Sequence, residues 1–193
     1  MWRRVSRWLY RISNGWVTVA ALIAFLLFSA LVLPRQAAQA EGESADAGSP
    51  DLALWYSTGE LYAMAEAYGE QGRKAYVRAR FTFDLVWPLV YGAFLTSAIS
   101  WLYARSFSPG SWQRLANLVP PLSVAFDYLE NLSTSVVMLR YPGRTPVIDA
   151  LAPLFTLVKW ALVGGSFVLL LAGLVAAIWR QIAQRQAREL PPA

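Results

Sequence analysis

Four stretches of this sequence are long enough and apolar enough to cross a lipid bilayer as helices. A helix needs about 20 predominantly apolar residues to cross the hydrocarbon core of a membrane. The four stretches cover residues 16–33, 81–104, 115–139 and 149–179. The whole chain, with a mean hydropathy of +0.37, is also more apolar than an ordinary soluble domain. The sequence therefore predicts an all-α fold, a four-helix transmembrane bundle that forms one membrane domain over residues 1–193.

The positions of the charged residues predict how these helices cross the membrane. The N-terminal segment, the loop between the second and third spans, and the C-terminal tail together carry nine basic residues and one acidic residue. The loop between the first and second spans carries five basic and seven acidic residues. Because cytoplasmic loops are enriched in Lys and Arg, we expect a multi-pass protein of the inner (plasma) membrane with both termini in the cytoplasm. This topology accounts for the net charge of +5, so we expect no nucleic-acid partner.

An alternative for the first span is a cleaved signal peptide. An arginine-rich start, an apolar run and the small residues at 36–40 (QAAQA) match that arrangement. We favour an uncleaved span, because the apolar run is longer than a usual signal core and Arg35 precedes the cleavage site. Cleavage would leave three spans and a new N-terminus outside.

The chain contains no Cys and no His. This composition excludes disulfides, thiol nucleophiles, imidazole acid–base chemistry, and zinc or haem sites of the usual kinds. We therefore expect no metal and no cofactor. Any catalysis would depend on carboxylates, lysine, tyrosine or hydroxyl groups.

The loop outside the membrane is predicted to contain a linker over residues 34–50 and an amphipathic interfacial helix over about 57–69. Residues 41–50 (EGESADAGSP) are small and acidic, as in flexible linkers. Ser57 and Glu60 have the spacing of a capping box, which opens a helix. The apolar residues that follow recur at helical spacing: Leu61, Met64, Ala65 and Tyr68. We expect this helix to lie on the outer membrane surface or to dock over the bundle.

The third span carries a polar face. Ser123, Asp127, Glu130, Asn131 and Thr134 recur at helical spacing in an otherwise apolar stretch. An Asp at the centre of a bilayer costs about 3 kcal/mol or more, so such residues usually face the interior of a bundle and belong to a site. At about 1.5 Å per residue, Asp127 is expected near the midplane and Glu130 in the outer half.

The second span carries one acidic residue near its outer end. Asp84, Trp87 and Tyr91 are separated by three and four residues, so they share one helix face. Arg78 and Arg80 lie directly before this span, and we expect one of them to pair with Asp84.

The fourth span contains the only basic residue within the four apolar stretches, Lys159. It lies about 15 Å below the outer surface, at the depth expected for Asp127 and Glu130, and we predict that it pairs with one of these carboxylates. Thr156 lies three residues before it on the same face. Glycines at 164–165 are expected to allow the close approach of a neighbouring helix.

The polar and aromatic residues of the second, third and fourth spans form the predicted site. Two carboxylates near one lysine disfavour joint ionisation, which is a property both of proton-transfer sites and of structural networks. The candidates for acid–base catalysis are Glu130, Asp127 and Lys159. The predicted ligand-binding residues are Asp84, Trp87, Tyr91, Asp127, Glu130, Asn131, Thr134, Thr156 and Lys159.

Short motifs between residues 56 and 160 resemble those of a family of small four-span bacterial integral membrane proteins. They are GR-x-x-Y at 72–76, D-x-x-x-P-x-x-Y at 84–91, D-x-x-E-N at 127–131 and T-x-x-K at 156–159. This resemblance implies a fold without a known activity. A second similarity, at the level of the fold alone, is to the EXPERA superfamily of sterol isomerases and sterol-binding proteins.

The favoured function is a membrane protein that binds a lipid or other hydrophobic ligand, or a partner membrane subunit, through its buried polar cluster. The alternative is an isomerase-like enzyme that modifies a lipid, sterol or isoprenoid, with Glu130 or Asp127 as the acid–base group. No nucleophile elbow, metal triad or phosphate-binding loop occurs in the sequence, so a role without catalysis is preferred. A proton or ion pathway would need polar residues throughout the cytoplasmic half, where few occur.

Overall fold

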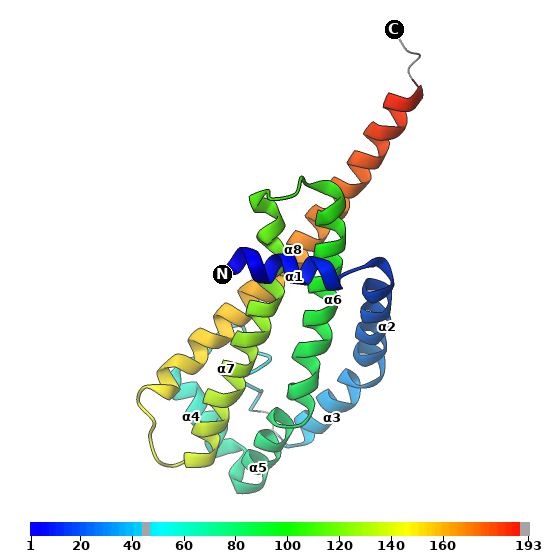
Figure 1. Ribbon diagram of the computed structural model, residues 1–193. Helices are drawn as coiled ribbons and strands as arrows, with labels where there is room; N and C mark the ends of the chain where they lie inside the picture. Colours follow the sequence, from blue (N-terminus) through cyan, green and yellow to red (C-terminus); the bar gives the residue numbers. More distant parts are fainter. Residues whose placement is uncertain (44–46, 190–193) are drawn as a thin grey trace.

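The computed structural model describes residues 1–43 and 47–189, and it is built from helices with no strand among these residues (Figure 1). The all-α prediction is therefore confirmed. The elements in chain order are α1 (Trp2–Ile12), α2 (Gly15–Leu31), α3 (Leu33–Glu43), α4 (Thr58–Ala67), α5 (Gly69–Arg80), α6 (Phe83–Ser106), the 3₁₀ helix η1 (Trp112–Leu118), α7 (Val119–Arg140) and α8 (Ile148–Glu189).

Three helical stretches in the described part of the chain are long and apolar enough to cross a membrane. They cover Gly15–Gln39, Gly69–Ser106 and Ile148–Gln186. The apolar windows of the first and third are 0% and 11% buried, whereas that of the second is 61% buried. Exposed apolar helices of this kind have no partner in water, so these surfaces are suited to contact lipid.

The third predicted span, α7, is long enough but less apolar than the other three. Its 22 residues include ten buried ones, and all of those except Pro120, Val137 and Met138 are polar. The polar face that the sequence shows therefore faces the neighbouring helices. Because of this polar face, α7 is not among the helices that are apolar enough in composition to cross a membrane.

Helices α6, α7 and α8 pack against one another, and α2 packs along α6 (Figure 1). The closest approaches occur at two glycines. A Cβ atom on Gly92 would lie 2.5 Å from Val124 on α7, and one on Gly173 would lie 2.6 Å from the Tyr103 ring on α6. The expectation for residues 164–165 is wrong, because a Cβ atom on either glycine there would meet nothing within 4 Å.

The predicted linker over residues 34–50 is wrong for its first part, because α3 extends through it to Glu43. Pro34 is tolerated there since the first turn of a helix needs no proline N–H, and the Gln and Ala residues that follow are good helix formers. Residues 44–46 of the expected linker lie outside the described residues. The other predicted spans differ at their ends: residues 115–118 belong to η1, and α8 continues past residue 179 to Glu189.

Helix α4 opens with the predicted capping box. The Ser57 hydroxyl accepts from the Glu60 N–H at 3.2 Å, and the Glu60 carboxylate accepts from the Ser57 N–H at 2.7 Å. The buried residues Leu61 and Ala65 pack with Val137 of α7 and its neighbours. Helix α4 therefore packs against α7 and α8.

Helix α1 crosses the molecule on the side of η1, far from α4 (Figure 1). Fully buried Asn117 joins three elements there. Its amide donates to the Ser6 carbonyl at 3.2 Å and to the Ser100 hydroxyl at 3.1 Å, and its side-chain oxygen accepts from the Ser6 hydroxyl at 2.8 Å. These bonds attach the N-terminal helix to η1 and α6.

Asn117→Ala is expected to destabilise the protein by about 1–3 kcal/mol, because it leaves the hydrogen-bonding groups of Ser6 and Ser100 without their partner in a buried position. The free energy of unfolding in mixed micelles titrated with a denaturing detergent measures the effect. Gln113→Ala, in the same 3₁₀ helix, is the control and should change little. Equal losses for the two variants would contradict the role given to Asn117.

Candidate functional site

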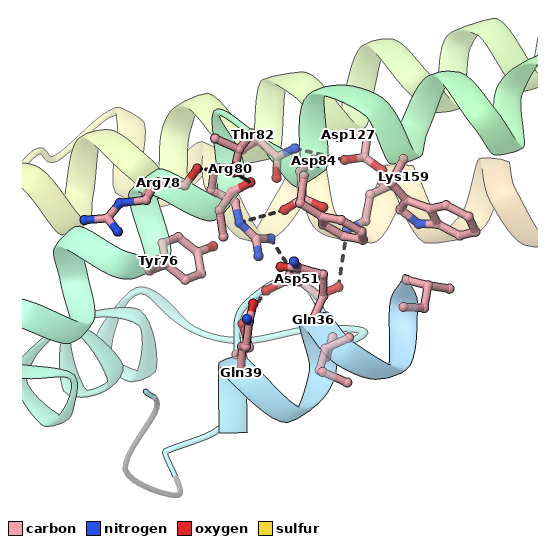
Figure 2. A pocket seen from close by; sticks show the side chains of 18 of the residues that line it. Gln36, Gln39, Asp51, Tyr76, Arg78, Arg80, Thr82, Asp84, Asp127 and Lys159 are labelled. Carbon is pink, nitrogen blue, oxygen red and sulfur yellow. Dashed lines mark hydrogen bonds and ion pairs between the residues drawn. The ribbon is translucent and has the colours of Figure 1, made fainter. Parts of the chain in front are cut away.

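A cavity of about 570 Å³ lies between α2 and α3 on one side and α5, α6, α7 and α8 on the other. Residues 49–52, which follow the part of the chain left undescribed, close one side of it. Figure 2 shows the charged and polar side chains that point toward this space. The polar lining includes Gln36, Gln39, Asp51, Arg80, Asp84, Asp127, Asn131 and Lys159. The apolar lining includes Phe25, Leu33, Trp87, Trp160, Val163 and Phe167.

The predicted pairing of Lys159 with one of the α7 carboxylates is confirmed, and the partner is Glu130. Glu130 is 0% exposed, and one of its oxygens contacts the Lys159 ammonium. The other oxygen accepts from the Thr156 hydroxyl at 2.7 Å, and the Tyr56 hydroxyl lies 3.1 Å from the same Thr156 oxygen. Lys159 also donates to the Asp51 carbonyl at 3.3 Å. Both charges of this ion pair are therefore neutralised inside the protein.

Arg80 makes a second charged contact at the N-terminal end of α6. Its guanidinium lies 2.9 Å from a carboxylate oxygen of Asp84 and 2.9 Å from one of Asp51, and it stacks 4.6 Å above the Tyr76 ring. Figure 2 shows Arg80, and not Arg78, between the two carboxylates. The expected anchoring of Asp84 is confirmed, and the arginine that provides it is Arg80.

Asp127 differs from the other buried carboxylates of the cavity. The Tyr91 hydroxyl donates to one of its oxygens at 3.0 Å, and the Asn131 amide donates to the other at 3.1 Å. No salt bridge to Asp127 occurs among the described residues. Asp127 is thus held by neutral donors while it lines the cavity, which is an unusual position for a carboxylate in an apolar chain.

The predicted site residues separate into two groups. Six of them line the cavity: Asp84, Trp87, Tyr91, Asp127, Asn131 and Lys159. Glu130, Thr134 and Thr156 are fully buried and lie behind this lining. Thr134 accepts from the Tyr76 hydroxyl at 3.1 Å and donates to the Glu130 carbonyl at 2.9 Å, so it joins α5 to α7.

The aromatic wall of the cavity comes from two helices. The Trp87 ring stacks on Phe25 and Phe28 of α2, with centroids 5.7 Å and 5.5 Å apart, and meets Tyr91 edge-on at 5.7 Å. Offset and edge-on ring pairs of this kind add stability beyond the area that they bury. The wall therefore fixes α2 against α6 and gives the cavity an apolar side.

The sequence reasoning missed Asp51, Gln36 and Gln39. Asp51 directly follows the segment that was expected to be a flexible linker, and the two glutamines lie on α3, which was not expected to be helical. An acidic residue just before the start of a folded segment was the one indication available for Asp51. Its partner, however, is 29 positions away in the sequence, and no local pattern identifies it.

Comparisons with protein-family models, with curated proteins and with solved structures found no match. The site is therefore interpreted from its own chemistry. In residues 1–43 and 47–189, no group of three or more acidic side chains is arranged to hold a metal ion.

Lys159→Met should destabilise the protein by about 3–5 kcal/mol, because it leaves the Glu130 carboxylate buried without a countercharge. The double variant Lys159→Met, Glu130→Gln should recover most of that loss, since it removes both charges. Unfolding in mixed micelles measures both values.

The control is Lys74→Met, which breaks the exposed pair of Lys74 with Glu70 on α5. Exposed pairs contribute little to stability, so no measurable change is expected. A double variant no more stable than Lys159→Met alone would contradict the interpretation of the Lys159–Glu130 pair.

Asp51 should make the stability depend on pH. Burial alone would raise the pKa of Asp51, but the Arg80 guanidinium and the Ser49 hydroxyl outweigh burial and hold it below its usual range. A carboxyl with a lowered folded pKa stabilises the fold above its unfolded pKa of about 4, and this stabilisation is lost as pH falls through the folded pKa. Asp51→Asn should therefore be less stable than the natural chain at pH 7. The difference should shrink below about pH 4, and a constant difference from pH 7 to 3 would contradict the prediction.

Proposed function

We propose that this protein is a multi-pass membrane protein that binds a lipid or a similar amphipathic molecule in the cavity beside Asp127. The observation that carries this proposal is the division of the cavity lining into a charged end and an apolar wall. Ligand pockets typically combine an apolar lining with a few well-placed polar groups. A cavity of about 570 Å³ is also within the size range of such pockets.

The membrane arrangement that we propose is a four-helix bundle of α2, α6, α7 and α8. Helix α7 is about 33 Å long at 1.5 Å per residue, which is enough to cross the hydrocarbon core. The excess of arginine in the terminal segments, together with Arg105 and Arg114 between the second and third spans, supports cytoplasmic termini and a location in the inner membrane. In this orientation the cavity opens in the outer half of the membrane, and the aromatic residues around α4 lie at the outer interface.

The polar end of the ligand is expected to contact Asp127. Arg80 and Lys159 are already compensated by Asp51, Asp84 and Glu130. Asp127 is hydrogen-bonded to neutral groups, so its carboxyl group, whether ionised or protonated, is available to the ligand. A hydroxyl or amine group on the ligand would supply the missing donor.

The apolar end of the ligand would lie along the aromatic wall. Phe25 and Trp87 form one side of the cavity, and Val163 and Phe167 of α8 form the other. A chain or ring placed between them gains the free energy of apolar burial, about 25 cal/mol per Å². This orientation directs the head of the ligand toward Asp127 and its tail toward Val163 and Phe167.

Val163→Trp should remove the ligand by filling the apolar part of the cavity without changing any charged residue. The protein is purified from its native membranes in mild detergent, and the bound molecules are counted by native mass spectrometry. We expect the natural chain to retain about one ligand per protein, and Val163→Trp to retain at least tenfold less.

Leu171→Trp is the matched control, because Leu171 is on the same helix, is 61% exposed and does not line the cavity. This variant should retain the ligand. Equal retention by the natural chain and both variants would overturn the proposal. Retention of a protein instead of a small molecule would favour the alternative of a partner membrane subunit.

The position of Asp127 in the lining of the cavity favours one further candidate function, an enzyme acting on a lipid, sterol or isoprenoid. Asp127 would be the acid–base group, because a carboxyl held by Tyr91 and Asn131 can exchange a proton with a bound molecule. Glu130 is the less suitable residue, since it is sealed behind Lys159 and does not line the cavity. Turnover that disappears in Asp127→Asn while ligand retention persists would support this candidate over passive binding.

A further inference from the structure

A second cavity, of about 410 Å³, lies between α1 and residues 109–115. Four arginines and three hydroxyl groups line it, and no acidic residue does: Arg3, Arg7, Arg11, Arg114, Ser6, Tyr10 and Ser111. Arg3, Arg7 and Arg11 follow one another at intervals of four, so α1 presents them along one face. The backbone of residues 109–111 completes the opposite side.

The described contacts of these arginines are to carbonyl groups. Arg3 donates to the Gly110 carbonyl at 3.4 Å, and Arg7 donates to the Arg3 carbonyl at 3.2 Å. Arg114 donates to the Phe107 carbonyl at 2.8 Å and lies 5.2 Å above the Tyr10 ring. Carbonyl groups orient a guanidinium but do not cancel its charge.

No salt bridge among the described residues involves any of the four arginines. The ion pairs that do occur lie on α5, around the first cavity and on α7 and α8. Four positive charges therefore surround a space that contains no carboxylate. Such a space attracts an anion, and guanidinium groups favour phosphate because their planar N–H groups match its oxygens.

The position of α1 indicates the level at which such an anion would bind. Trp2 and Trp8 are each 57% exposed, and Val5 and Ile12 are exposed on the same side of the helix. Aromatic and aliphatic residues beside arginines are typical of a helix that lies in the headgroup region of a membrane. The arginine-lined cavity would then be at the depth of lipid phosphates.

We propose that this cavity binds the phosphate group of an anionic ligand, carried by a phospholipid headgroup or by a free phosphate compound. The site is separate from the first cavity, and the proposal does not depend on the ligand that occupies the first. It differs from general attraction between basic loops and anionic membranes, because it assigns the binding to Arg7 and Arg11 and not to the neighbouring Arg4, which does not line the cavity.

The test uses the full chain in a nonionic detergent, freed of native lipid, and titrated with three probes. These are phosphatidylglycerol, phosphatidylcholine and glycerol 3-phosphate, with binding counted by native mass spectrometry. Phosphatidylglycerol should bind the natural chain at least tenfold more tightly than phosphatidylcholine. Competition by glycerol 3-phosphate would show that a free phosphate compound suffices, and its failure to compete would identify the lipid headgroup as the source.

Arg7→Gln and Arg11→Gln should each weaken the binding of phosphatidylglycerol about tenfold, the factor that corresponds to the loss of one charge-assisted contact. Arg4→Gln is the matched control on the same helix, and it should change binding less than about threefold. Equal losses for Arg4→Gln and Arg7→Gln would overturn the proposal in favour of unspecific surface attraction. Equal binding of the two lipids, or no binding of any probe, would also overturn it.

Discussion

The ion pair between Lys159 and Glu130 is the interaction on which the arrangement of α7 and α8 depends. Both groups are almost fully removed from solvent, and neither charge is tolerable in an apolar environment without the other. The pair therefore fixes the depth of the two helices relative to each other, and a shift by one turn of about 5.4 Å would separate the charges. Thr156 and Tyr56 add neutral hydrogen-bonding groups that keep the carboxylate in place.

Around this pair, the charged residues form a series of contacts that leads from Lys159 to the loop that carries Asp51. Lys159 reaches the Asp51 carbonyl, Arg80 holds the Asp51 side chain, and Arg80 also holds Asp84 at the start of α6. Asp127 lies beside these residues and takes no part in their ion pairs. The cavity thus combines a fixed set of balanced charges with one carboxyl that has neutral neighbours, and this difference gives Asp127 its proposed role.

The sequence was sufficient for features that depend on helical periodicity, and insufficient for those that depend on the packing of distant segments. Spacing alone placed the polar face of α7 inside, paired Lys159 with an α7 carboxylate and predicted the capping box at Ser57. Asp51 could not be assigned, because its position depends on how a loop folds back over α6. The prediction of close packing at residues 164–165 is wrong because it depends on the rotation of α8 about its axis, which no single helix pattern specifies. Gly173, and not these two glycines, lies against Tyr103.

The attachment of Asp51 has a consequence for the kinetics of any molecule in the first cavity. Residues 49–52 form one side of that cavity, and Arg80 and Lys159 both hold them there. A molecule leaving on this side would have to wait until these contacts open together, so the opening of the loop would set an upper limit on the rate of exit there. Ligands of different affinity would then be released on this side no faster than residues 49–52 move away.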